Sequence, residues 1–239
     1  ETQGCTPDVT LYATPDDSSA RGPWPVGVRT ATIASLTAEI WYPAELGRDA
    51  GEPPVTYDLR QWLPDSEMGK IPDEKPPLQT CGCSRDLPLD AAHGPYPVVV
   101  FIHGTAGFRT QSLAQMEHWA SRGFVVVAAD YPGLYLRDAL DLKLGADLTG
   151  DTQKILDALP AAGGELAFLA SHLDLTRIGL SGHSAGGNGV ASFGSAPGVR
   201  VLMPLAAGGT EPTPTLESTL VMGGKLDKVK GFGPKTVAA

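Results

Sequence analysis

The sequence predicts an α/β domain built on a mostly parallel, doubly wound sheet, and three observations support this. Residues 96–102 and 124–129 are continuous apolar runs, which suit strands buried on both faces of a sheet. Segments with helical spacing of apolar residues alternate with such runs, as in sheets that helices cover on both sides. The 239 residues suffice for a substantial core, so residues 1–239 are expected to form a single domain.

The first part of the chain predicts a strand pair and then a long irregular excursion. Residues 1–27 are rich in Pro, Gly, Ser and Asp and are expected to be extended, whereas residues 28–42 predict two early strands that Pro43 closes. Residues 43–93 carry many prolines and little periodicity, apart from one or two helical turns expected at 57–63. Long segments of this kind are often functional, so the excursion either roofs an active site or is a plain surface feature.

The remaining elements follow from the spacing of apolar residues. A helix is expected at 112–122, because Leu113, Met116 and Trp119 recur at helical spacing and Gly123 follows. The other expected elements, in chain order, are a helix at 147–159, a strand at 177–181, a helix from Ala185, and strands at 199–205 and 218–223.

Composition excludes some functions and favours one compartment. The formal net charge is −9 and no basic stretch occurs, which argues against nucleic acid as a partner. No apolar run is long enough to cross a bilayer, so no transmembrane segment is expected. The chain begins with Glu1, which suggests a removed signal peptide, and we expect a secreted or periplasmic protein.

The three cysteines are Cys5, Cys81 and Cys83, all in loop-like surroundings. A disulfide is plausible in a secreted protein, although the sequence leaves the pairing open. Cys81 and Cys83 are an alternative zinc pair, but no second Cys or His pair stands at matching spacing, so no metal is expected. An odd count leaves one thiol without a partner in this chain.

The segment Gly182-His183-Ser184-Ala185-Gly186 fits the pattern G-x-S-x-G, which indicates a nucleophilic serine. A short apolar strand precedes it and small residues follow, as a tight strand-to-helix turn requires. We therefore predict Ser184 as the nucleophile and the N–H of Ala185 as an oxyanion donor at the helix start. The alternative is a Gly-rich turn that merely allows close packing.

The segment His103-Gly104-Thr105-Ala106-Gly107 directly follows the strand at 96–102 and predicts the second oxyanion donor. The N–H of Thr105 is the expected donor, with that of Ala106 as the less favoured alternative. Gly104 is expected to let the backbone approach the substrate oxygen. His103 is expected to shape this loop, as His183 shapes the serine turn, and is a poorer candidate for the catalytic base.

The acid is predicted at Asp227, which follows the last expected strand and lies downstream of Ser184. Asp130 precedes the nucleophile and is expected to fix a loop, while Glu211 and Glu217 precede that strand and are poorer candidates.

The catalytic histidine is not evident, because all five histidines precede Ser184. Without an imidazole base the rate of serine catalysis falls by orders of magnitude. We expect the histidine on a C-terminal fragment of the same precursor, nicked near Ala239, so that this chain lacks the last strand and helix of its fold. The alternatives are an unusual base, His183 or His103, and a non-catalytic binding protein that kept the fold.

Four segments, residues 38–43, 94–104, 123–132 and 182–187, resemble dienelactone-hydrolase-like and platelet-activating-factor-acetylhydrolase-like esterases and cutinase-like polyester hydrolases. The resemblance implies an α/β-hydrolase fold and cleavage of small or polymeric carboxylic esters through an acyl-enzyme, without metal or organic cofactor. It assigns the same roles to Ser184, Asp227, Ala185 and Thr105. Family members place the base in a loop after the last strand, which this sequence ends before. Lactones and amides remain alternative substrates.

Overall fold

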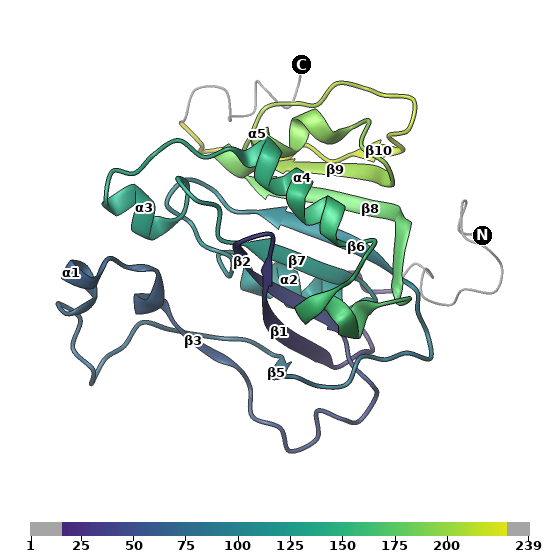
Figure 1. The fold of residues 1–239 in the computed structure, drawn as a ribbon, viewed down its shortest axis with the longest axis horizontal. Helices are drawn as coiled ribbons and strands as arrows, with labels where there is room; N and C mark the ends of the chain where they lie inside the picture. The colour runs from purple at the N-terminus through teal and green to yellow at the C-terminus, as the bar shows by residue number, and fades with distance from the viewer. Residues whose placement is uncertain (1–15, 229–239) are drawn as a thin grey trace.

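The computed structural model describes residues 16–228, which form an eight-stranded sheet with helices on both faces and a separate two-stranded sheet (Figure 1). The strand order across the sheet is β10-β9-β8-β6-β7-β2-β1-β5. The strands of this sheet are β1 (Val26–Ile33), β2 (Leu36–Pro43), β5 (Ser84–Arg85), β6 (Tyr96–Ile102), β7 (Val125–Ala129), β8 (Leu173–His183), β9 (Val199–Leu205) and β10 (Ser218–Thr219). The predicted doubly wound α/β sheet is confirmed.

The central strands run in one direction, and this brings their carboxyl ends to one edge. β6 pairs in parallel with β7 and β8, and β9 pairs in parallel with β8 and β10. β2 is antiparallel both to β1 and to β7, so the early strand pair forms a hairpin beside the parallel half. Loops that carry function in parallel sheets lie at such a carboxyl edge, where the segments after β6, β8 and β10 meet.

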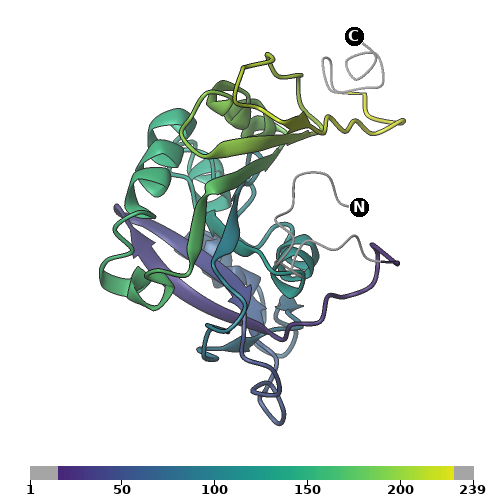
Figure 2. The ribbon, with the colours of Figure 1, turned by 90° about the vertical axis from the view of Figure 1, so that its right-hand side faces the viewer.

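Helices cover the two faces of the sheet unequally, as the turned view shows (Figure 2). One face packs against α4 (Leu148–Ala158), α5 (Ala185–Val190) and the 3-10 helix η3 (Gly164–Leu169). The other packs against α2 (Leu113–Ser121), whose Leu113 and Met116 lie in a second core with Trp41. Because both faces are covered, the central strands are apolar on both sides, as the sequence predicted.

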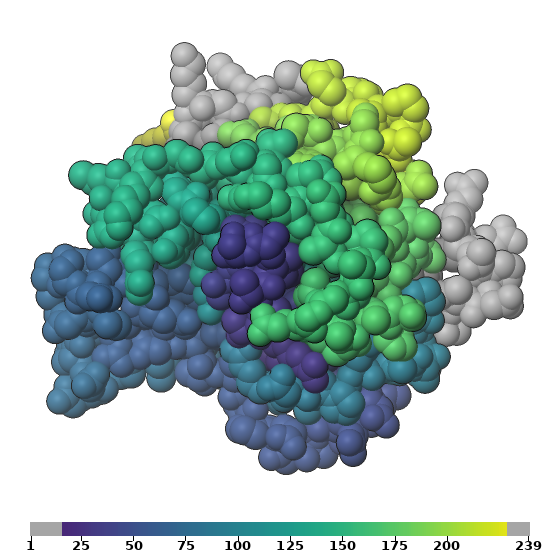
Figure 3. Space-filling view, in the orientation of Figure 1, coloured from purple at the N-terminus to yellow at the C-terminus, as the bar shows by residue number. Residues whose placement is uncertain are grey.

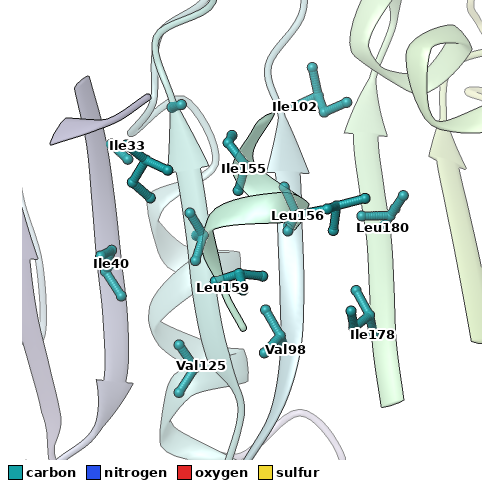
Figure 4. Packing of buried hydrophobic residues seen from close by; sticks show 14 of the residues in the cluster. Ile33, Ile40, Val98, Ile102, Val125, Ile155, Leu156, Leu159, Ile178 and Leu180 are labelled. Carbon is teal, nitrogen blue, oxygen red and sulfur yellow. The ribbon is translucent and has the colours of Figure 1, made fainter. Parts of the chain in front are cut away.

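The larger core lies between α4 and the parallel strands (Figure 4). Ile155 and Leu156 of α4 pack with Val98 of β6 and Leu180 of β8 in one buried cluster. Each such side chain contributes roughly 1.5–3 kcal/mol through burial. This packing fixes the ends of β6 and β8 relative to each other, and the segments that follow these two strands therefore start from rigid positions.

Several elements differ from the sequence-based expectation in length. β8 begins at Leu173 instead of residue 177, and β10 covers Ser218–Thr219 alone. Beyond β10 the chain still follows β9, through the bond from Leu220 N–H to the Leu202 carbonyl and a single bridge between Met222 and Leu205. The difference arises because residues 218–222 lie at the sheet edge, where most of them are exposed and burial does not enforce strand pairing.

The excursion at 43–93 contains short elements that the sequence did not predict. They are β3 (Thr56–Asp58), β4 (Leu78–Thr80), β5 and α1 (Asp65–Met68), whereas the 3-10 helix η2 (Leu59–Trp62) lies within the helical turns expected at 57–63. Another short helix, α3 (Leu136–Leu140), follows β7 and was also not predicted. In the space-filling view the blue residues of the excursion spread over one side of the molecule (Figure 3).

A buried ion-pair network fastens the excursion to the sheet. Glu39 on β2 is fully buried and binds Arg85 and Arg109. The Tyr57 hydroxyl donates to Glu39 at 2.9 Å, and Arg109 also pairs with Asp130 at the end of β7. Asp130 therefore fixes a loop, as expected. Two carboxylates and two guanidinium groups balance in charge, with Glu39, Arg109 and Asp130 largely buried and the Arg85 side chain 39% exposed.

A disulfide joins Cys81 to Cys83, while Cys5 lies outside the described residues. In this disulfide the two sulfurs are bonded to each other, which is the pairing that a secreted protein permits. Between them, the Gly82 N–H donates to Glu117 of α2, and its carbonyl accepts from Arg21. The disulfide loop thereby joins the N-terminal segment to α2.

Candidate active site

Ser184 lies on the sharp turn between β8 and α5, in strained backbone geometry. Its φ of 54° and ψ of −116° belong to a region that non-glycine residues rarely adopt. The neighbouring glycines make the turn sterically possible. A Cβ on Gly182 would lie 2.3 Å from the Gly186 carbonyl oxygen, and one on Gly186 would lie 2.2 Å from the Ile102 carbonyl oxygen.

Replacing Gly186 with alanine is therefore expected to destabilise the fold. The added methyl group meets backbone atoms of Ile102 and His103, which cannot move without displacing the end of β6. Overpacking of this kind costs about 1–3 kcal/mol, measurable as a lower midpoint of urea denaturation. Gly209→Ala is the matched control, because a Cβ there meets nothing within 4 Å. Equal stability of the two variants would contradict this description of the turn.

The backbone of Ser184 is held on both sides while its side chain stays available. Its N–H donates to the Leu205 carbonyl at 2.8 Å, and its carbonyl accepts from the Asn188 N–H at 3.0 Å. The residue is half-buried, and within residues 16–228 its hydroxyl makes no hydrogen bond. The turn thus presents a fixed hydroxyl at the carboxyl edge of the sheet.

The loop after β6 offers one unused backbone donor beside that turn. The Gly104 N–H donates to Gln111 at 2.9 Å, the Ala106 N–H to the Leu134 carbonyl at 2.8 Å, and the Gly107 N–H to the Gly104 carbonyl at 2.9 Å. Among the described residues the Thr105 N–H has no acceptor. The N–H of Ala106, the less favoured candidate for the oxyanion donor, therefore already has an acceptor, and the N–H of Thr105 is the donor that remains.

Gly104 brings this loop into contact with the serine turn. A Cβ on Gly104 would lie 2.8 Å from His183 Nδ1 and 3.4 Å from the Ser184 Cβ. The N–H of Ala185, the first residue of α5, also lacks an acceptor in the described part of the chain. Two unused amide donors therefore flank one hydroxyl, which is the arrangement that stabilises a tetrahedral oxyanion.

Comparison with solved structures agrees with this geometry. A ferulic acid esterase from Streptomyces cinnamoneus matches with a TM-score of 0.57 and 22% identity, over 89% of this chain and 67% of the esterase chain. The chain has the α/β-hydrolase fold. A family model described as Chlorophyllase matches residues 87–200, which include the β6 loop and the serine turn. No curated protein matches the sequence. The α/β-hydrolase fold that the sequence resemblance implies is thereby confirmed.

His103 is buried at the end of β6, and both of its ring nitrogens make hydrogen bonds. Nδ1 lies 2.8 Å from the Gly104 carbonyl oxygen and so donates, while Nε2 accepts from the Tyr131 N–H at 3.2 Å. Burial lowers the pKa of the imidazole below its usual value of 6.5, which favours the neutral ring. His103 therefore shapes the loop and has no free lone pair for the serine proton.

The buried His103 is expected to make stability depend on pH. Between its lowered pKa in the folded protein and 6.5, the unfolded chain binds a proton that the folded protein does not. The free energy of unfolding therefore falls as the pH drops below 6.5, by at most about 1.4 kcal/mol per pH unit. Urea denaturation between pH 5 and about 7 measures this slope, and His103→Asn should remove it. If the free energy of unfolding of His103→Asn depends on pH as steeply as that of the unaltered protein, the buried neutral His103 is not the cause.

The Nδ1 atom of His183 is also engaged in a hydrogen bond. Its Nδ1 lies 3.1 Å from Gln111 Nε2. Because the Gly104 N–H can only donate, Gln111 must turn its oxygen to Gly104 and its NH₂ to His183. The lone pair of Nδ1 therefore accepts this bond, and His183 in its neutral form carries its proton on Nε2. The ring has no second lone pair, so its use as an unusual base is disfavoured.

The other three histidines lie away from the serine turn along the chain and the sheet. His93 pairs with Asp90 before β6, His172 directly precedes β8, and His118 lies in α2. The segments before β6 and β8 belong to the amino edge of the sheet, opposite the edge that carries Ser184. No described histidine thus shows a free lone pair at Ser184, and the catalytic base remains a prediction.

Asp227 follows the strand-like segment after β10, in a turn where its N–H donates to the Gly224 carbonyl at 3.0 Å. Met222 bridges Leu205, and Leu205 accepts the N–H of Ser184. The segment that leads to Asp227 therefore reaches the same edge of the sheet as the serine. The carboxylate is half-buried, and its role as the acid remains a prediction.

Some residues at this edge escaped the sequence analysis. Phe108 stacks on Trp62 of η2 with ring centroids 4.4 Å apart, and the guanidinium of Arg109 lies over the same indole. Arg137 of α3 donates to the Gln61 and Leu63 carbonyls. The excursion thus packs against the loop that carries Thr105. Nothing in the local sequence signals these contacts, since their partners lie tens of residues apart.

Residues 16–228 also bear on metal binding and on insertion into a membrane. No cluster of three or more His, Cys, Asp or Glu side chains there is arranged to hold a metal ion. Within the same residues, no helix has both the length and the apolar character needed to span a membrane.

Proposed function

We propose that this α/β-hydrolase cleaves carboxylic esters, with Ser184 as the nucleophile. The observation that carries the proposal is the pair of unused amides, Thr105 and Ala185, on either side of a strained serine turn. Binding proteins have no need for this combination. The chlorophyllase family match and the esterase named in the structural match support ester substrates over amides or lactones.

The proposed reaction proceeds through an acyl-enzyme. The Ser184 oxygen attacks the ester carbonyl carbon as a histidine takes its proton, and the carbonyl oxygen becomes an oxyanion between the N–H groups of Thr105 and Ala185. Each donor contributes about 3 kcal/mol to lowering the barrier. The histidine then protonates the alkoxide oxygen as its bond to the carbonyl carbon breaks, and the alcohol leaves. The same histidine next takes a proton from water, which attacks the acyl-enzyme carbonyl, and returns it to the Ser184 oxygen as the acid is released. Neither step needs a metal or organic cofactor.

The proposed base is a histidine other than the five in this sequence. The lone pairs of His103 and His183 are already used, and the proposal therefore assigns the base to a C-terminal fragment of the same precursor, oriented by Asp227. Export from the cytoplasm, to the periplasm or outside the cell, is proposed as well, and the Cys81–Cys83 disulfide supports it.

Hydrolysis of a panel of carboxylic esters tests the function. Alkyl acetates, longer alkyl esters and a feruloyl ester are compared with the matching amides by titration of the released acid. The proposal expects turnover of at least one ester class and a lower rate on its amide.

A non-catalytic binding protein is the competing function, and the occupied histidines favour it. That function predicts ester binding without acid release.

A further inference from the structure

We infer that Gln111 is a positioning residue that locks the two halves of the oxyanion site together. This inference rests on the proposed ester hydrolysis. Gln111 lies between the loop after β6 and the start of α2, and no sequence motif includes it. Its side-chain amide contacts two residues of the site. One is Gly104, which precedes the proposed oxyanion donor Thr105, and the other is His183, which precedes the proposed nucleophile Ser184.

The two contacts differ in direction, and this difference fixes the amide group. Gln111 Oε1 accepts the Gly104 N–H at 2.9 Å, and Nε2 donates to His183 Nδ1 at 3.1 Å. A flipped amide would place two donors against each other at Gly104. The pair of bonds therefore holds one rotamer of Gln111 and one tautomer of His183.

The position of Gln111 is itself fixed by its neighbours. Its N–H donates to the Phe108 carbonyl at 2.8 Å. The preceding residue, Thr110, is bonded twice to Gln79 of β4, through its hydroxyl at 2.8 Å and its carbonyl at 3.0 Å. Gly107 leaves the necessary room, because a Cβ there would lie 2.2 Å from Gln111 Oε1.

The same network of hydrogen bonds fixes the orientation of the Thr105 N–H. The Gly104 carbonyl accepts from His103 Nδ1 at 2.8 Å and from the Gly107 N–H at 2.9 Å. In a trans peptide the carbonyl and the next N–H point in opposite directions, so bonds on the Gly104 carbonyl turn the Thr105 N–H away from them. Gln111 binds the N–H of Gly104, and its second bond, to His183, links this loop to the turn that carries Ser184.

Loss of Gln111 should therefore lower kcat more than it changes KM. A misplacement of about 1 Å in a catalytic group costs about 10²-fold in rate. Gln111→Met keeps the size but removes both bonds, and kcat should fall about 10²-fold with KM within about 3-fold. Gln111→Glu keeps an acceptor for the Gly104 N–H but cannot donate to His183 Nδ1, so only part of this loss should be rescued. Gln153→Met is the control, since Gln153 is exposed on α4.

Coupling to His183 distinguishes positioning from general packing. His183→Ala removes the second contact, and the double variant with Gln111→Met should lose little more kcat than either single variant. Multiplying losses would indicate independent structural effects and would overturn the inference.

The intact protein is also followed by hydrogen exchange of the peptide that covers residues 103–107. Faster exchange in Gln111→Met, together with the loss of kcat, supports the inference. Unchanged exchange overturns it, whether or not the protein hydrolyses esters. If the unaltered protein turns over no ester, the proposed function fails, and the exchange result alone decides whether Gln111 holds the loop.

Discussion

Replacing Ser184 with alanine should lower kcat for ester hydrolysis by about 10⁶-fold, the size of loss that removal of a serine nucleophile causes in other hydrolases. Alanine can take the same backbone geometry, so the turn and both amide donors should stay in place. Residual activity would come from the donors at Thr105 and Ala185, which stabilise an oxyanion whatever group attacks the carbonyl. Initial rates on the best ester of the panel measure the effect.

The control for this variant is Ser192→Ala. Ser192 is exposed in the short 3-10 helix after α5, and its hydroxyl contacts only the Gly189 carbonyl at 3.4 Å within the described residues. That variant should keep full activity. Ester hydrolysis that survives in Ser184→Ala at the unaltered rate would place the nucleophile elsewhere.

Replacing Glu39 with glutamine should reduce the free energy of unfolding by about 2–3 kcal/mol, the size of a lost hydrogen bond to a charged group. The fully buried carboxylate loses its charge, the buried Arg109 keeps Asp130 as its carboxylate partner, and the Arg85 side chain is 39% exposed. The Tyr57 hydroxyl also loses a charged acceptor. Urea denaturation followed by tryptophan fluorescence reports the change, because Trp62 bonds to Asp130 in the same network.

A surface carboxylate provides the comparison for Glu39. Glu45 pairs with Arg48, and both side chains are more than half exposed, so Glu45→Gln should change stability by less than about 0.5 kcal/mol. If both glutamine variants unfold at the same urea concentration, the buried network contributes no more than a surface pair. The excursion would then be held by its apolar contacts alone.

The sequence predicted the buried part of the fold better than its edges. β6 has the predicted bounds, since a strand buried on both faces is a continuous apolar run, and β9, which is partly buried, also has its predicted bounds. Short elements were missed because contacts far along the chain stabilise them. Arg137 of α3, for example, donates to carbonyls of Gln61 and Leu63, more than 70 residues away.

Within the candidate site, too, the sequence indicates residues in local motifs and misses residues whose role depends on contacts far along the chain. Ser184 and Thr105 belong to local motifs whose spacing signals a turn and a loop, so the sequence could single them out. Gln111 could not be found, because its meaning depends on Gly104 and on His183, which lies 72 residues away. The occupied lone pair of His103 was equally hidden, since Tyr131 becomes its donor only once β6 and β7 pair.

The account depends most directly on the reactivity of Ser184, which covalent labelling measures. The intact protein is treated with a fluorophosphonate, and the modified residue is located by peptide mass spectrometry. We predict one adduct per molecule, on Ser184, that a competing ester substrate suppresses and that Ser184→Ala abolishes. An unlabelled Ser184, under conditions in which a reference esterase is labelled completely, would contradict the account.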